Sequence, residues 1–358
     1  MDTEPLFAPV RLGAIDLKNR IVMAPLTRSR ASTMGVPAVF AAKYYAQRAS
    51  AGLVITEATQ VSHDAMGYCR TPGVYTAEQQ AVWRTVIDAV HAKGGKIVVQ
   101  LWHCGRIAAS INRGGGGETV APSAIQAPGK MWTDQQGMID HDMPRALETN
   151  EIAKIAADFA NTAKAAVDLG FDGVEVHSAN GYLLHQFLSS NVNQRTDQYG
   201  GSIENRVRMP LEVVTAILEK VPSDRVGVRI SPGHAFNGIE ETDMAELYGH
   251  YLGRLDEYGL AYLHVMRPFA NKIDTDPVTM ARSAYAGAII ACGGYTAETG
   301  AQAVASRSAD AVAFGKDYIS NPDLVERLQA GAALTPPHQA TFYTPGEKGY
   351  TDYSAMTA

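Results

Sequence analysis

His177, Asn180 and Tyr182 are the polar residues whose types and spacing could do chemistry together. They follow the short apolar run 173–176, and Gly181 among them permits a sharp bend. The imidazole and the amide can both donate hydrogen bonds to one oxygen on which negative charge develops. The phenol, with a reference pKa of about 10, stays protonated at neutral pH and can act as a general acid. The alternative is that these residues only cap the loop after a strand.

The composition excludes several classes of protein. The chain has 358 residues, 46% of them hydrophobic, yet no apolar run reaches the roughly 18 residues of a membrane span. The net charge of -6 argues against a nucleic-acid-binding surface. Three cysteines are too few and too scattered for a disulfide framework or a zinc site. We expect a cytoplasmic protein, monomeric or homodimeric, that acts on small molecules and binds neither membrane nor nucleic acid.

Eight apolar, strand-like runs alternate with helical stretches along the chain. The runs lie near 20–25, 53–57, 96–101, 171–177, 225–230, 260–265, 287–291 and 309–314. The helical stretches lie near 36–51, 78–93, 150–169, 203–220, 244–258, 277–285, 297–306 and 322–329. Short continuous apolar runs indicate strands buried on both faces of a parallel sheet. Eight such units predict an α/β fold, the (β/α)8 or TIM barrel.

Two additions to this barrel are expected. Residues 6–19 have the pattern of a β-hairpin that turns near Gly13, and a glycine-, proline- and polar-rich segment, 105–145, is inserted after the third strand. The alternative fold is a doubly wound open sheet, but no Gly-x-Gly-x-x-Gly motif follows the first strand. Since no low-complexity linker divides the chain, we expect residues 1–358 to form a single domain.

In such barrels the active site lies at the carboxyl ends of the strands. Here those ends carry aromatic and hydrogen-bonding side chains, among them Gln100, Trp102 and His177, and Glu57 is the only acid expected close by. Glycoside hydrolysis needs a pair of carboxylates, and metal-dependent hydrolysis needs His or Asp ligands. The pattern disfavours both reactions and predicts no metal site.

The glycines after the last two strands suit a phosphate group. Gly293, Gly294 and Gly315 occupy positions where barrels bind phosphate through backbone N–H groups, and Lys316 adds positive charge. The alternative for the first two is a tight turn only.

Arg229 is a cation within an apolar strand, so it needs an anionic partner. That partner could be a ring system that gains negative charge on reduction, or a buried Asp or Glu. The residues alone leave both possibilities open.

A set of motifs in order resembles the old yellow enzyme family, the FMN-dependent ene-reductases that include N-ethylmaleimide reductase and pentaerythritol tetranitrate reductase. The resemblance covers nearly the whole chain. The motifs include Lys18-Asn-Arg-Ile, Met23-Ala-Pro-Leu-Thr-Arg28, Val99-Gln-Leu-Trp-His103, His177-Ser-Ala-Asn-Gly-Tyr182, Asp197-Gln-Tyr-Gly-Gly-Ser-Ile-Glu-Asn-Arg206 and Gly349-Tyr-Thr-Asp-Tyr353. Any one motif is weak, but their order and spacing together are highly specific.

The resemblance implies one non-covalent FMN, with NADPH or NADH as the hydride donor. It implies that the flavin ring is lined by Pro25, Leu26, Thr27, Ala58, Gln100 and Arg229. The phosphate would be held by Gly293, Gly294, Gly315 and Lys316. The oxygen of an activated alkene would be bound by His177 and Asn180, and the proton delivered by Tyr182. The substrate pocket would be shaped by Tyr68, Trp102 and Tyr343, whose alternative role is core packing.

The sequence departs from the family pattern in two places. Most relatives carry arginine where this chain has Lys316, a point charge rather than a planar fork. The stretch after the sixth strand, Val265-Met-Arg-Pro-Phe269, is also unusual, and we expect Arg267 and Phe269 to border the site and to affect substrate preference.

The sequence therefore predicts an FMN-dependent, NAD(P)H-consuming ene-reductase that reduces activated C=C bonds of α,β-unsaturated carbonyl and nitro compounds. Three alternatives stay open. One is a nitrate-ester or nitroaromatic reductase that uses the same site. The others are a flavin-binding redox sensor without turnover and a flavin-free barrel lyase.

Overall fold

The computed structural model describes residues 3–114, 116–268 and 275–356. Eight parallel strands close into a ring, because β11, at one end of the sheet, also pairs with β6 near the other end. In ring order they are β3 (Ile21–Met23), β4 (Leu53–Ile55), β6 (Ile97–Trp102), β11 (Gly173–His177), β12 (Val226–Ile230), β13 (Tyr262–Met266), β14 (Ile289–Cys292) and β15 (Ala311–Phe314). The predicted TIM barrel is confirmed.

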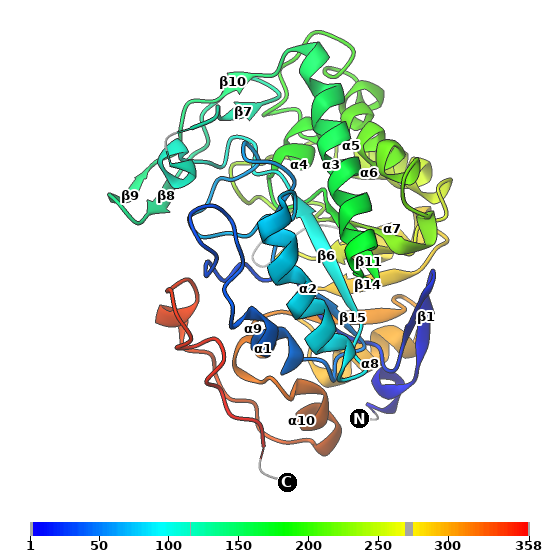
Figure 1. Cartoon of the computed structure of the whole chain (residues 1–358). Coiled ribbons are helices and arrows are strands. Elements are labelled where there is room, and N and C mark those ends of the chain that lie inside the picture. Colours follow the sequence, from blue (N-terminus) through cyan, green and yellow to red (C-terminus); the bar gives the residue numbers. More distant parts are fainter. Residues whose placement is uncertain (1–2, 115, 269–274, 357–358) are drawn as a thin grey trace.

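Helices surround the barrel, as Figure 1 shows. They include α1 (Ala41–Ala46), α2 (Ala77–His91), α3 (Thr149–Leu169), α5 (Ile203–Leu218), α6 (Met244–Asp256), α7 (Pro277–Ala284), α8 (Ala297–Ala305) and α10 (Leu324–Ala330). Local sequence sets their ends: Thr76 and Gln79 form a capping box at the start of α2, and Gly170 ends α3 with a φ of +113°. In the described part of the chain no helix is both long and apolar enough to cross a membrane.

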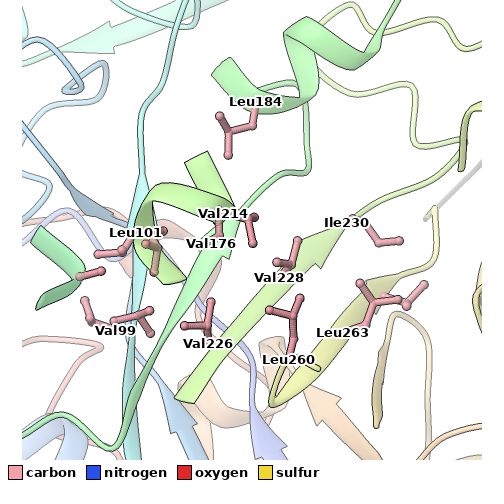
Figure 2. Packing of buried hydrophobic residues seen from close by; sticks show 14 of the residues in the cluster. Val99, Leu101, Val176, Leu184, Val214, Val226, Val228, Ile230, Leu260 and Leu263 are labelled. Carbon is pink, nitrogen blue, oxygen red and sulfur yellow. The ribbon is translucent and has the colours of Figure 1, made fainter. Parts of the chain in front are cut away.

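The outward-facing side of each barrel strand is buried against the surrounding helices. Val176 of β11 and Val228 of β12 share this outer apolar layer with Val214 of α5 (Figure 2). All three side chains are fully buried. Burial on both faces explains why these strands have continuous apolar sequences with little alternation.

The inner face of the barrel is apolar toward the amino ends of the strands and polar toward their carboxyl ends. The predicted hairpin is present as β1 (Val10–Leu12) and β2 (Ile15–Leu17), with Gly13 at its turn. Its apolar side chains join inward-facing residues of the strands in one cluster: Leu12, Ile15, Leu17, Val22, Leu53, Val98 and Ile290. This apolar cluster fills the amino end of the barrel. The polar inward-facing residues therefore lie toward the carboxyl ends of the strands.

The segment inserted after β6 has secondary structure of its own, which its composition did not predict. It contains η2 (Ser110–Arg113), β7 (Val120–Ala121), β8 (Lys130–Thr133), β9 (Gly137–Asp140) and β10 (Arg145–Ala146). Strands β8 and β9 form an antiparallel hairpin that projects beside the barrel (Figure 1). The hairpin is anchored because Met131 packs against Ile107, Ala109 and Ala127.

Candidate active site

A tight turn at the carboxyl end of β11 holds the predicted catalytic residues. His177 ends the strand, Asn180 and Gly181 have φ angles of +56° and +74°, and Tyr182 is the N-cap of α4 (Leu183–Leu188). A Cβ atom at position 181 would lie 2.7 Å from the Phe236 carbonyl oxygen, so only glycine fits there. The reversal turns the two side chains at 177 and 182 toward each other, with ring centroids 5.0 Å apart.

Hydrogen bonds from three directions fix this turn. The backbone N–H of Asn180 donates to Ser231 Oγ at 2.8 Å, and its carbonyl accepts from Asn237 Nδ2 at 2.8 Å. The backbone N–H of Gly181 donates to His185 Nδ1 at 3.0 Å, while His185 Nε2 lies 2.9 Å from Glu241 Oε1. Because Nδ1 accepts, Nε2 carries the hydrogen and donates to the carboxylate.

The His177 imidazole is buried and electrically neutral. Burial, and then the nearby charge of Arg229, lower its pKa well below the ordinary value. Its Nδ1 atom has no hydrogen-bond partner among the described residues. A neutral imidazole has one N–H to donate, so it can bind an oxygen that becomes negative without bringing a full charge of its own.

The Asn180 side chain is oriented by a second histidine. Its Oδ1 atom lies 3.2 Å from His234 Nδ1, and burial lowers the pKa of His234 to about 4. With the amide oxygen engaged in this way, the amide N–H groups remain for a ligand oxygen. The predicted pair of donors, His177 and Asn180, therefore has the right chemistry at one strand end.

An aromatic cluster borders the turn. The Tyr182 hydroxyl donates to the Tyr68 hydroxyl at 3.3 Å, and the Tyr182 ring stands edge-on to Trp102 with centroids 4.8 Å apart. The rings of Tyr68 and Trp102 stack at 5.5 Å. Burial raises the pKa of both tyrosines, which keeps them protonated at neutral pH. Two of the three predicted pocket aromatics thus surround the predicted proton donor.

Tyr343, the third predicted pocket aromatic, lies at a more open position. Its side chain is 59% exposed and its ring contacts Phe342. Its carbonyl oxygen accepts a hydrogen bond of 2.8 Å from Arg70, two residues after Tyr68. This hydrogen bond connects the C-terminal segment to the loop that carries Tyr68.

Gln100 and Arg229 lie inside the barrel, toward the carboxyl ends of the strands. The Gln100 side chain donates from Nε2 to Glu175 Oε1 at 2.7 Å. Among the described residues, the NH2 group of Arg229 hydrogen-bonds to two sulfur atoms, Met266 Sδ at 2.9 Å and Cys292 Sγ at 4.0 Å. Its Nε atom has no partner, and no carboxylate within 4.0 Å forms an ion pair with it in the described residues. Of the two partners left open for this cation, a directly paired Asp or Glu is therefore not found there.

The predicted phosphate residues lie at adjacent strand ends. Gly293 and Gly294, directly after β14, have φ angles of +103° and +73°, which other residues rarely adopt. Gly315 follows β15 and caps the short helix α9 (Lys316–Ser320), whose first residue is exposed. A Cβ at position 315 would lie 3.7 Å from Leu26, so the predicted ring-lining segment after β3 is close by.

The remaining predicted ring-lining residues lie on neighbouring strand ends. Pro25, Leu26 and Thr27 are half-buried directly after β3. Ala58 is buried and clusters with Trp102. All the predicted cofactor residues therefore lie on the same end of the barrel.

Arg267, which we expected to border the site, is held in an ion pair. Its guanidinium donates to both Asp276 carboxylate oxygens and lies 4.5 Å from the centre of the Tyr295 ring. Its backbone lies against Gly293, where a Cβ would meet the Arg267 carbonyl oxygen at 3.0 Å. Phe269, the other unusual residue, lies outside the described residues.

The expectation that Glu57 is the only nearby acid is wrong. Glu175 lies fully buried inside the barrel, against Gln100 and His264. Glu57 instead accepts a hydrogen bond from the backbone N–H of Arg28. The signal for Glu175 was present, since a charged residue within an apolar strand is the same feature that singled out Arg229.

Comparison with known proteins identifies the family. A family model described as the NADH:flavin oxidoreductase / NADH oxidase family matches residues 5–335. The chain belongs to this family. The predicted membership of the old yellow enzyme group is confirmed, and this flavin oxidoreductase uses FMN with a nicotinamide as hydride donor.

Relatives of this flavin oxidoreductase cover nearly its whole length. A probable flavin mononucleotide-dependent alkene reductase of Leishmania infantum is 42% identical, over 98% of this chain and 97% of the relative. The structure of morphinone reductase in complex with tetrahydroNAD superposes with a TM-score of 0.93, at 46% identity and 98% coverage of each chain. An old yellow enzyme homologue from Zymomonas mobilis gives a TM-score of 0.95 at 39% identity, over 98% of this chain and 99% of the other.

The site of this flavin oxidoreductase fits an FMN group. Buried polar atoms without a partner among the described residues include Arg229 Nε, His177 Nδ1 and Trp102 Nε1. Buried polar groups ordinarily have hydrogen-bond partners, so these atoms suit a ligand rich in oxygen and nitrogen. A cation without a paired carboxylate suits a ring that becomes anionic on reduction.

Proposed function

We propose that this protein is an ene-reductase that reduces activated C=C bonds of α,β-unsaturated carbonyl and nitro compounds. The observation that carries the proposal is the convergence of His177, Asn180 and Tyr182 on one turn beside Trp102. Two neutral donors and a protonated phenol are what addition of a hydride and a proton across such a bond requires. The resemblance to an alkene reductase supports the same reaction.

The cofactor residues would share the binding of FMN between its ring and its phosphate. Gln100 and Arg229 would hold the pyrimidine part of a non-covalently bound FMN, together with Pro25, Leu26, Thr27 and Ala58. The backbone turns at Gly293, Gly294 and Gly315 would hold its phosphate, with charge from Lys316. The chemistry that a bound FMN would supply is transfer of a hydride from NAD(P)H to the substrate.

His177 and Asn180 would bind the carbonyl or nitro oxygen of the substrate. As the β-carbon receives hydride, negative charge moves to that oxygen and both hydrogen bonds strengthen. The neutral state of His177 suits this task, because its single N–H is held at a buried site that excludes water. These donors also orient the alkene, with Trp102 and Tyr68 as pocket walls and Tyr343 at the rim.

Tyr182 would deliver the proton to the α-carbon. Burial, and then the neighbouring Tyr68 and Cys104, raise the pKa of the phenol well above its ordinary value, so it is protonated throughout the neutral range. The resulting phenolate recovers its proton from solvent or through the Tyr68 hydroxyl. The proposal treats residues 1–358 as one cytoplasmic FMN-binding domain, monomeric or homodimeric.

Product analysis under anaerobic conditions tests the function. The purified protein should release FMN, and not FAD, on heating. With NADPH or NADH it should convert cyclohexenone to cyclohexanone. Flavin that stays attached after denaturation, or reduced FMN enzyme that leaves cyclohexenone unchanged but consumes a nitrate ester, would contradict the proposal.

A further inference from the structure

A buried carboxylate connects the two residues proposed for the pyrimidine end of the flavin. Glu175 lies in the middle of β11 and is 0% exposed. Its Oε1 atom accepts from Gln100 Nε2 at 2.7 Å, and its Oε2 atom lies 2.9 Å from His264 Nδ1. His264 is also 0% exposed. The three side chains form one chain of hydrogen bonds across the barrel interior.

The strand register makes this connection possible. Glu175 is opposite Gln100 on β6 and opposite Gly227 on β12, and the next strand, β13, carries His264. Position 227 must be glycine, since a Cβ there would lie 2.3 Å from the Tyr262 ring. Because β12 has no side chain at this position, the Tyr262 ring of β13 lies against Gly227, and His264 of the same strand reaches Glu175 of β11.

A carboxylate accepts hydrogen bonds but donates none, so it decides which way the Gln100 amide faces. The NH2 group of Gln100 turns toward Glu175, and the amide oxygen and the second N–H are directed elsewhere. The pyrimidine edge of a flavin presents an N–H between two carbonyl groups. An amide held in this one orientation can accept from that N–H and donate to one neighbouring carbonyl.

The Glu175 carboxylate is also close enough to Arg229 for the two charges to interact. Burial alone would raise the pKa of Glu175, but the charge of His264, its hydrogen bond and the charge of Arg229 outweigh burial and lower it. Burial alone would lower the pKa of His264, and the charge of Glu175 raises it instead. Glu175 therefore stays ionised, and its charge opposes the positive charge of Arg229.

We propose that Glu175, held by His264, is a positioning residue that orients Gln100 toward the flavin and offsets the charge of Arg229. The inference rests on the proposed FMN site. It assigns this carboxylate two separable effects, one on FMN affinity through Gln100 and one on reduction potential through its charge.

The test compares Glu175→Gln, Gln100→Leu and the double variant. For each, a titration with FMN gives the affinity, and a redox titration gives the midpoint potential of the bound flavin. In Glu175→Gln, FMN binding should weaken on the order of ten-fold, because a carboxamide no longer dictates the orientation of Gln100. The potential should rise, since the positive charge beside the reduced anionic ring is less opposed. In the Gln100→Leu background the same substitution should cause no further loss of affinity and still raise the potential.

Asp172→Asn is the matched control. It removes another carboxylate that is paired with a histidine, His91, but that lies before β11 and does not contact Gln100. FMN affinity and potential should stay at the parent values. If Glu175→Gln does not fold, Glu175→Asp keeps the charge but shortens the reach, so it should weaken FMN binding at a nearly unchanged potential.

Parent values of both quantities in Glu175→Gln would overturn the inference, as would an equal loss of affinity with and without Gln100. Parent FMN affinity in Glu175→Asp would overturn it as well. A parent enzyme that binds no FMN would instead refute the proposed function itself, so the two failures are distinguishable.

Discussion

The Tyr182 hydroxyl donates a hydrogen bond to the Tyr68 hydroxyl across 3.3 Å. The first residue comes from the turn after β11 and the second from the segment between β4 and α2, so the contact joins the ends of two strands that flank β6. Both phenols are kept protonated by burial. The pair therefore places a second protonated phenol within hydrogen-bond distance of the one proposed to protonate the substrate.

His177→Ala should separate the two halves of the catalytic cycle. Loss of one preorganised donor typically slows the step that develops negative charge on oxygen by roughly 10²–10³-fold. Reduction of the flavin by NAD(P)H should slow less, because no substrate oxyanion forms in that step. Stopped-flow rates of each half-reaction measure this, and an unchanged rate of enone reduction would refute the assignment of His177.

Arg229→Met should lower the midpoint potential of the flavin. The substitution removes the cation near the ring and leaves Glu175 unopposed, so the reduced anionic form is disfavoured. Arg229→Lys, which keeps the charge, is the control and should lie nearer the parent potential. A potential that rises or stays constant in the Met variant would show that Arg229 is not beside the reducible ring.

Arg70→Ala should loosen the rim of the pocket. Arg70 has a φ of +53°, pairs with Asp134 of the β8–β9 turn and donates to the carbonyl oxygens of Ser29 and Tyr343. Losing these charge-assisted bonds should raise KM for a bulky enone on the order of ten-fold, with a smaller effect on kcat. The exposed Arg11, paired with Asp16 on the opposite end of the barrel, is the control position. Equal kinetics in Arg70→Ala and Arg11→Ala would contradict this role.

Glu57 should make stability depend on pH in a specific direction. Burial raises its pKa to about 7, while an unfolded glutamate titrates near 4.3. The folded protein therefore holds a proton that the unfolded chain has lost, and stability from this group falls as pH rises from about 4 to about 7. Glu57→Gln should remove that loss. Its free energy of unfolding relative to the parent should increase between pH 5 and pH 8 by about 3 kcal/mol. Urea unfolding at both pH values measures this, and a constant difference would contradict it.

The barrel and the main site could be predicted because both leave local signals. Buried parallel strands have continuous apolar sequences, and the turn at 180–182 shows its polar residues beside a glycine. The ordered hairpin at 130–140 was missed, since glycine- and proline-rich surroundings hide the alternation that buries Met131 and Thr133.

Contacts between distant residues could not be predicted in the same way. Glu175 and His264 are 89 positions apart and lie on the two strands that flank β12. Arg70 and Tyr343 are 273 positions apart, and their contact depends on the path of the C-terminal segment. Such pairs follow from strand register and chain path, which single-sequence patterns do not specify.

The proton-transfer role of Tyr182 is the central claim, and anaerobic stopped-flow on Tyr182→Phe tests it most directly. The substitution keeps the ring and its packing against Trp102 but removes the oxygen. Reduction of FMN by NAD(P)H should proceed at the parent rate, because it needs no proton from Tyr182. Reoxidation by cyclohexenone should slow by roughly 10²–10⁴-fold. Reoxidation by a nitroalkene should slow less, because its nitronate can leave before carbon is protonated. Cyclohexenone reduction at the parent rate would contradict the account and assign the proton to solvent or to Tyr68.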